Sequence, residues 1–188
     1  MTNWRDMSAE NGRLPATAYA VLGLLSFGQE LSGYELRRWA LNLRFFYWSP
    51  AQSHIYLELR RLRRRGYVDD RLVAQNGRPD KRLYHITETG LAAFRDWEER
   101  AAVEPPQLKH SVALRLFFGH QASPERLAAM LDDYTAFVRT RLDELRVVHE
   151  GIAGNDAFTY PAMVAEWGFV YFEAELAAVE RLRARLET

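Results

Sequence analysis

The sequence predicts a mainly α-helical fold with one small β-hairpin, divided into an N-terminal and a C-terminal domain. Apolar residues recur every three or four positions over most of the chain, which is the period of an amphipathic helix. Two runs of strand-like composition, residues 67–73 and 81–87, flank a loop that contains Asn76-Gly77, a strong hairpin signal. After Pro105-Pro106 no strand-like run remains, so an all-α unit of antiparallel helices is expected there.

The composition restricts the class of protein. With 188 residues, 48% of them hydrophobic, the chain can fold around a sizeable core. It has no cysteine, which excludes disulfides and thiolate metal sites and suits a reducing compartment. The first residues lack the apolar core of a signal peptide, and the longest apolar stretch, Ala18 to Leu25, is far too short to span a membrane. We therefore expect a cytoplasmic protein with no membrane partner.

The charges are divided unevenly between the two halves. Residues 1–90 contain 14 Lys and Arg against 9 Asp and Glu, whereas residues 91–188 contain 11 against 16. The net charges of +5 and −5 cancel over the whole chain. A basic first half indicates a surface that meets an anion, while the acidic half serves another purpose.

Two helices are expected at the start of the first domain, which we place at residues 15–104 after an N-terminal arm of residues 1–14. The first helix covers 15–27 and ends at Gly28. Ser32 is the expected N-cap of the second helix, because Glu35 follows three residues later in the capping-box pattern. That helix should run to about Leu43.

A third helix should open at Ser49-Pro50, an N-cap followed by proline at the first helical position, and last until Gly66. The hairpin follows it. Thr87 or Thr89 should then cap a fourth helix that passes through Trp97. Three helices followed by a hairpin is the element order of a winged helix-turn-helix, in which the recognition helix enters the major groove of DNA.

The C-terminal domain, residues 105–188, should consist of helices alone. We expect a short helix at about 108–118, a long one capped by Ser123-Pro124, and a last one that Pro161 opens. The two long helices carry apolar seams that would join two copies of the chain. The seam residues are Leu127, Leu131, Tyr134, Val138, Leu142 and Leu145, and then Trp167, Tyr171, Leu176, Val179 and Leu182.

The third helix has two faces. Its inner face should consist of Ala51, Ile55, Leu59 and Leu62. The outer face carries arginines in its C-terminal half, which suit DNA phosphates, and other side chains in its N-terminal half, which suit base edges. An ordinary solvated charge run near a helix C-terminus is the alternative. The basic residues of the hairpin favour DNA. The predicted DNA contacts of helix and hairpin are Gln52, Ser53, His54, Leu57, Arg60, Arg61, Arg64, Arg78, Lys81 and Arg82.

Residues 15–98 also resemble the PadR-like transcriptional regulators. The resemblance is carried by Leu22-Gly23-Leu24-Leu25, Gly33-Tyr34-Glu35-Leu36, Ile55-Tyr56 with Leu59 and Leu62, Gly66, Gly77-Arg78-Pro79, Tyr84, Ile86-Thr87 and Gly90. It implies a winged-helix homodimer, in most members a repressor, with the C-terminal helices as its dimerisation unit. It also implies DNA-backbone contacts by Tyr34 and Tyr56, together with Arg78 and Lys81. Leu57, where the family often has proline, and Asp80, an acid at the wing, depart from the family pattern.

Several of these residues have a second interpretation. The two tyrosines could be half-buried packing residues, and the wing arginines could serve only solubility. An aromatic set would form an effector pocket between the domains or would simply be core and interface. Its members are Trp39, Phe45, Trp48, Phe117 and Trp167. No histidine pair has metal-ligand spacing and no catalytic motif is present, so we expect neither a metal, nor a cofactor, nor an enzyme.

The sequence as a whole predicts a homodimeric, sequence-specific transcriptional regulator that represses from a palindromic operator and responds to a small aromatic or hydrophobic effector. The rival interpretation is a winged-helix module that binds a protein partner instead of DNA. The basic outer face argues against this rival, because a protein-binding module does not need arginines aligned on one side.

Overall fold

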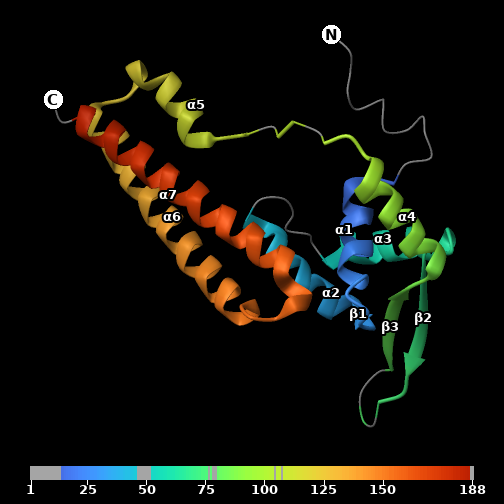
Figure 1. The fold of residues 1–188 in the computed structure, drawn as a ribbon. Helices are drawn as coiled ribbons and strands as arrows, with labels where there is room; N and C mark the ends of the chain where they lie inside the picture. Colours follow the sequence, from blue (N-terminus) through green and yellow to red (C-terminus); the bar gives the residue numbers. More distant parts are fainter. Residues whose placement is uncertain are drawn as a thin grey trace. The chain divides into compact units, whose positions relative to one another are not determined.

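The structure is a computed structural model that describes residues 14–45, 52–75, 77, 80–103, 105–106 and 108–186. The chain divides into two compact units, Met1–Val103 and Glu104–Thr188 (Figure 1). The fold class is confirmed: the chain is mainly helical, with one small antiparallel sheet in the first unit. Among the described residues, no helix combines the length and the apolar character needed to cross a membrane.

The first unit has the predicted order of helices and hairpin, with one strand that the sequence did not predict. Its helices are α1 (Ala16–Leu25), α2 (Gly33–Ala40), α3 (Gln52–Arg64) and α4 (Glu88–Arg100), and its strands are β1 (Leu31–Ser32), β2 (Val68–Val73) and β3 (Lys81–Ile86). The strand order is β1-β3-β2, with both pairings antiparallel. β1 was missed because two residues are too few to show a strand period.

Helix boundaries in the first unit follow from capping. The predicted capping box is confirmed: the Ser32 side chain accepts from the Glu35 backbone, and the Glu35 carboxylate accepts from the Ser32 backbone. The prediction that α2 runs to Leu43 was wrong in detail, because the α-helix ends at Ala40 and a 3-10 helix, Leu41–Phe45, follows. Thr87 caps α4 as predicted. The predicted start of α3 at residues 49–50 lies outside the described residues.

One apolar core holds the first unit together. Residues from α1, α2, α3, the three strands and the inner face of α4 contribute to it. Its fully buried members include Leu22, Leu25, Leu36, Ile55, Leu59, Leu62 and Val68. The α3 residues in this group confirm three of the four predicted inner-face positions, and Ala51, the fourth, lies outside the described residues.

The second unit is a helical hairpin with one additional short helix. Its α-helices are α5 (Ser111–Phe117), α6 (Pro124–Ile152) and α7 (Thr159–Leu186). α6 and α7 lie side by side and antiparallel (Figure 1). Two contacts show this: Asp132 lies against Arg183 near one end, and His149 lies against Glu166 near the other. The prediction that Pro161 opens α7 was wrong. The helix begins two residues earlier at Thr159, and proline fits its first turn.

Candidate nucleic-acid interface

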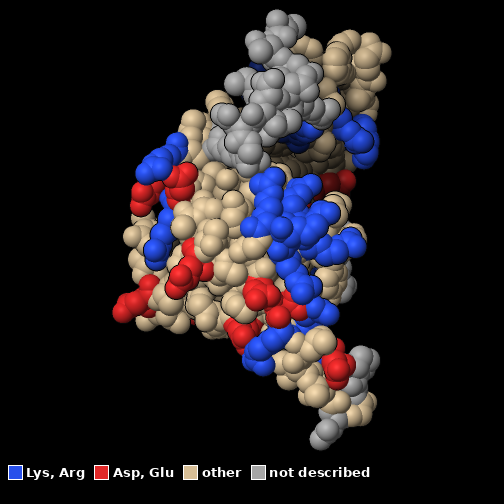
Figure 2. Space-filling view, turned by 90° about the vertical axis from the view of Figure 1, so that its right-hand side faces the viewer, with Lys and Arg blue, Asp and Glu red and all other residues tan. Residues whose placement is uncertain are grey.

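The outer face of α3 is exposed as the sequence predicts. Because the apolar residues of α3 are turned into the core, Ser53, His54, Leu57, Arg60 and Arg64 are left on the surface. No hydrogen bond or ion pair joins Arg60 or Arg64 to another described residue. Both guanidinium groups are therefore available to an anion. Figure 2 shows a face of the molecule on which Lys and Arg side chains gather into a continuous patch.

One charged residue of α3 faces inward, which the sequence analysis missed. Glu58 is only 7% exposed and accepts hydrogen bonds from Thr17 of α1 at 3.2 Å and from Arg61 at 3.2 Å. Its spacing of three residues from Ile55 places it on the inner face and was the signal that could have found it. Arg61, predicted to contact phosphate, is therefore engaged in compensating a buried carboxylate within the protein.

Tyr56 is positioned by a glycine. A Cβ atom at Gly33 would lie 2.5 Å from the Tyr56 ring, so the first residue of α2 has to be glycine for the ring to lie there. Tyr56 is 38% exposed and Tyr34 is 60% exposed. Both tyrosines can therefore meet a ligand, and Tyr56 is held in place by packing as well, so its two interpretations are compatible.

The hairpin is joined to α3 through Asp70. The Asp70 side chain is 3% exposed, and its Oδ1 lies 2.7 Å from Arg63 Nε, although the N–H is not aligned for a hydrogen bond. Arg82 of β3 donates to the other carboxylate oxygen. One acidic group thus holds an arginine of the recognition helix and an arginine of the wing.

An open groove of about 510 Å³ lies beside this link. It is lined by Ser53, Tyr56, Leu59, Arg60, Arg63, Arg82 and Tyr84. α3 supplies the first five of these residues and β3 the last two. Four of them were predicted as DNA contacts. Arg63 was not predicted as a contact, because the helical period places it at the edge of the outer face. It lines the groove because β3 lies opposite this edge of α3.

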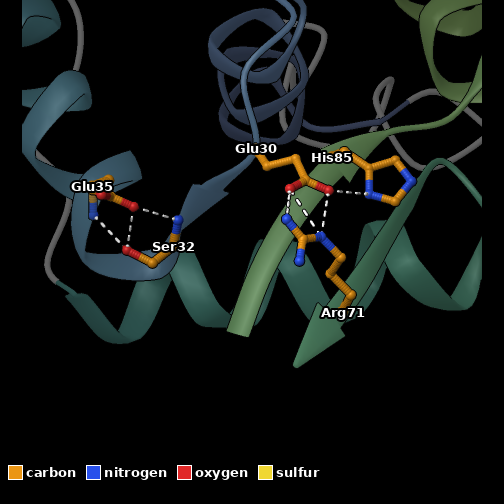
Figure 3. Close-up of polar contacts among 5 residues, drawn as sticks. All are labelled: Glu30, Ser32, Glu35, Arg71 and His85. Carbon is orange, nitrogen blue, oxygen red and sulfur yellow. Dashed lines mark hydrogen bonds and ion pairs between the residues drawn. The ribbon is translucent and has the colours of Figure 1, made fainter. Parts of the chain in front are cut away.

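The opposite face of the sheet contains a second link (Figure 3). Arg71 Nε of β2 lies 2.9 Å from both carboxylate oxygens of Glu30, and His85 Nδ1 of β3 lies 3.9 Å from the same carboxylate. Hydrogen bonding to Arg71 lowers the pKa of Glu30 despite some desolvation. This ion pair ties the residue before β1 to the outermost strand, across the central one.

Glu35 connects the capping box to the wing. Its carboxylate accepts from the Ser32 backbone at 2.8 Å and from Lys81 Nζ of β3 at 3.0 Å, and Figure 3 shows the contacts between Ser32 and Glu35. The hydrogen bonds from the backbone and hydroxyl of Ser32, with a smaller effect of Lys81, lower the pKa of Glu35 to about 2. Lys81 is therefore already paired within the protein. Two other predicted contacts, Arg78 and the side chain of Gln52, lie outside the described residues.

The second unit covers part of the predicted dimer seam by itself. Five seam residues are buried within this single chain: Leu131, Val138, Leu142, Leu145 and Val179. They were predicted to meet a second copy, but the apolar faces of α6 and α7 bury them within the unit. Leu127, Tyr134, Tyr171 and Leu176 are partly buried, whereas Trp167 and Leu182 are exposed. The seam pattern therefore describes an intrachain helical hairpin at its centre.

A polar cluster joins the three helices of the second unit. The Glu175 carboxylate of α7 lies 3.1 Å from His110 Nε2 and accepts a hydrogen bond from Tyr134 of α6 at 3.0 Å. His110 Nδ1 accepts from the Ala113 backbone and caps α5. Burial and the bond to Glu175 raise the pKa of Tyr134. Desolvation raises the pKa of Glu175, but the hydrogen bonds from its neighbours outweigh this effect and lower it.

The members of the predicted aromatic set lie in different environments. Trp39 packs on the core of the first unit and meets Phe27 edge-on, and the Phe45 ring lies beneath the Arg44 guanidinium. Phe117 is 80% exposed and Trp167 is 70% exposed on the second unit. Trp48 lies outside the described residues. Within the parts of the chain that are described, no group of three His, Asp or Glu residues could hold a metal ion.

Each of the two units matches a known protein-family model. Residues 21–96 match the Transcriptional regulator PadR-like family, and residues 108–187 match the family described as Virulence activator alpha C-term. The Negative transcriptional regulator PadR of Bacillus subtilis is 30% identical over 137 residues, which are 73% of this chain and 75% of that protein.

Solved structures agree over nearly the whole chain. Bacillus subtilis PadR in complex with operator DNA is similar with a TM-score of 0.82 and 25% identity, covering 92% of this chain and 99% of that one. Bacillus subtilis PadR in complex with p-coumaric acid has the same fold, with a TM-score of 0.75 and 22% identity over 93% and 100% of the two chains. The chain therefore belongs to the PadR-like family of DNA-binding transcriptional regulators, with a winged helix-turn-helix followed by a helical C-terminal domain.

Proposed function

We propose that this protein represses transcription by binding a palindromic operator as a homodimer, with residues 15–104 as the DNA-binding domain and residues 105–188 as the dimerisation domain. The observation that supports DNA binding most directly is the exposed outer face of α3, where Arg60 and Arg64 are unpaired among the described residues and lie C-terminal to Ser53 and His54. In a helix-turn-helix the N-terminal residues of the recognition helix meet base edges.

The contacts divide into two groups. Arg60 and Arg64 would contact phosphates, which give affinity and salt dependence without reading sequence. Ser53, His54 and Leu57 would face bases, where a hydroxyl or imidazole can hydrogen-bond and the leucine tip can meet a thymine methyl. Tyr34, with its largely exposed ring, would contact the DNA backbone. The unpaired arginines would thus provide affinity for DNA, and the first turns of α3 would provide sequence specificity.

Repression is supported by a relative, and dimerisation by the predicted seam of the second unit. The Bacillus subtilis protein is called a negative regulator, and one of its structures contains operator DNA. Two-fold symmetry would make the operator palindromic, with half-sites about 34–36 Å apart or a multiple of that distance. In the second unit, Trp167 and Leu182 are predicted seam residues whose side chains lie on the surface of the single chain.

A small aromatic effector would release the protein from DNA. Bacillus subtilis PadR has been solved with p-coumaric acid, an aromatic carboxylic acid. In this chain, the described members of the predicted aromatic set are Trp39 and Phe45 within the first unit and the exposed Phe117 and Trp167 within the second. An effector shifts the equilibrium between two arrangements of the DNA-binding domains only if it binds one arrangement more tightly than the other.

A gel-shift titration tests the DNA-binding function. The full chain is titrated onto duplex DNA from upstream of its own gene and onto a random duplex of equal length, at several salt concentrations. We expect tighter binding to the upstream DNA and affinity for both that falls steeply with salt. Equal affinity for the two duplexes, with no salt dependence, would refute the proposal and favour a protein-binding module. Adding p-coumarate to the preformed complex tests the effector, which should lower the bound fraction.

A further inference from the structure

We propose that the groove between α3 and β3 is a binding site for one DNA phosphodiester, and that Asp70 is the positioning residue that sets Arg63 and Arg82 on its walls. The proposal rests on the DNA-binding function proposed above and deepens it. It adds two residues, Arg63 and Asp70, that neither the sequence pattern nor the exposed face of α3 identifies as part of the interface.

The sheet register brings Asp70 to this place. Asp70 is the cross-strand partner of Tyr84, and Arg82 is two residues from Tyr84 on β3, so all three side chains lie on the same face of the sheet. Tyr84 is 8% exposed and belongs to the core. On the core side of the sheet, the Asp70 carboxylate therefore lies next to the C-terminal half of α3, where it contacts Arg63.

The charge balance of the groove favours an anion. Arg63 and Arg82 both lie against the single Asp70 carboxylate, which is almost completely shielded from water. Two guanidinium groups on one carboxylate leave one positive charge uncompensated, and Arg60 on the same wall adds a second. The Arg63 and Arg82 side chains remain 55% and 41% exposed, so their outer N–H groups are open to the groove.

The donors match a phosphodiester. Guanidinium groups present planar forks of N–H donors that bind phosphate oxygens in pairs, and a fork already fixed by a carboxylate loses less side-chain entropy on binding. Tyr56 adds a hydroxyl group to the lining, and Leu59 and Tyr84, which are almost fully buried, form its base. Because α3 and the wing both contribute, a phosphate bound here would fix the register of the recognition helix on the duplex.

The first experiment replaces Arg63 and counts the charge it contributes. Arg63→Gln is compared with Arg95→Gln, an exposed arginine on α4 outside the groove, on upstream and random duplex across a salt series. A lost phosphate contact should lower the slope of log affinity against log salt by about 0.9 and weaken binding to both DNAs by a similar factor. Arg95→Gln should leave the slope unchanged, and Arg63→Lys should restore it. An Arg63→Gln slope equal to wild type would overturn the phosphate site.

The second experiment separates positioning from charge. Asp70→Asn and Asp69→Asn each remove one negative charge from neighbouring positions of β2, but the Asp69 side chain points to the other face of the sheet. If only charge matters, both variants should bind DNA more tightly. If Asp70 positions the two arginines, Asp70→Asn should bind the upstream DNA several-fold more weakly than Asp69→Asn. Equal affinities would overturn the positioning role.

These results separate the two proposals. A wild-type protein without a salt slope would contradict DNA binding itself. A wild-type protein with a salt slope that Arg63→Gln does not change would contradict only the groove site. Thermal unfolding of each variant shows that it is folded at the assay temperature, and the Arg63 series does not depend on the folding of Asp70→Asn.

Discussion

Glu35 performs two tasks at once, and its negative charge strengthens both. Its carboxylate completes the capping box of α2 and pairs with Lys81 of the wing. Because the folded protein lowers the pKa of Glu35 from 4.5 to about 2, its stabilising contribution is present in full above pH 4.5 and is lost as the pH falls towards 2. At neutral pH, Glu35→Gln should therefore lower the free energy of unfolding by about 1 kcal/mol.

Denaturation of wild type and Glu35→Gln at pH 7 and pH 3 measures this effect. The difference in stability between the two proteins should shrink at pH 3, because Glu35 is then largely protonated in the unfolded chain while the folded protein still holds it ionised. Glu98→Gln, a charge loss at an exposed position of α4, serves as the control. A difference that is the same at both pH values would show that the charge of Glu35 is irrelevant.

Arg60 and Arg61 are sequence neighbours with opposite expected roles. Arg61 compensates the buried Glu58, so Arg61→Gln leaves that carboxylate short of a partner and should destabilise the fold by about 1–3 kcal/mol. Arg60→Gln should leave stability within about 0.5 kcal/mol of wild type and reduce the salt slope of DNA binding. Chemical denaturation and a salt titration of both variants measure the two effects. If the two variants behaved alike in both measurements, the assignment would be wrong.

At the scale of single residues, the sequence could show that five arginines cluster but not which of them are occupied. Helical periodicity alone placed Arg60, Arg61 and Arg64 on the outer face. Arg61 and Glu58 lie three residues apart on the same helix, but the pairing of Arg63 with Asp70 depends on how the hairpin packs on α3, which periodicity does not contain. The inward position of Glu58 could have been predicted from its spacing, and Asp70 could not, because its partner comes from a different element.

At the scale of elements, the contact between α2 and α3 depends on a glycine. Gly33→Ala would place a Cβ atom against the Tyr56 ring and should cost about 1–3 kcal/mol of stability, because the ring or the helix has to move. Since Tyr56 also lines the groove, DNA affinity should fall as well. Gly151→Ala of α6 is the matched control, because no atom lies within 4 Å of the added Cβ, and it should leave both properties intact or raise stability. A Gly33→Ala protein with wild-type stability and affinity would contradict this packing account.

The long helices of the second unit illustrate the limit of an apolar seam as a predictor. Spacing of three and four residues shows that a helix packs on another helix, but it does not say whether that helix is in the same chain. Leu131 is fully buried inside one chain, so Leu131→Ala should lower the stability of the fold itself by about 2–5 kcal/mol. Trp167→Ala, at an exposed seam position, should leave that fold intact and weaken the dimer.

Sedimentation and thermal unfolding, measured over a range of protein concentrations, separate these two outcomes. For Trp167→Ala we expect a shift towards monomer at low concentration with an unchanged circular dichroism spectrum. If the wild-type protein is monomeric at all concentrations, the dimerisation role of the second unit is wrong.

At the scale of the whole molecule, the order of elements was enough to predict the fold class. The Asn-Gly loop, the two caps at Ser32 and Thr87, and the loss of strand signal after Pro105-Pro106 are local signals, and each has its structural counterpart. Strand β1, the 3-10 helix after α2 and the Glu30–Arg71 link depend on tertiary packing. The fold was thus predictable from local rules, whereas the composition of the groove required the structure.

The comparison of Ser53→Ala with Arg60→Ala tests the central claim most directly. Affinities of both variants and of wild type are measured by fluorescence anisotropy on the upstream duplex, on single-base variants of it and on random duplex. We predict that Arg60→Ala weakens binding to all of them by a similar factor, whereas Ser53→Ala changes the ranking among the single-base variants by about 1–3 kcal/mol. If both substitutions had the same effect on every duplex, or none on any, α3 would not be the DNA-reading element.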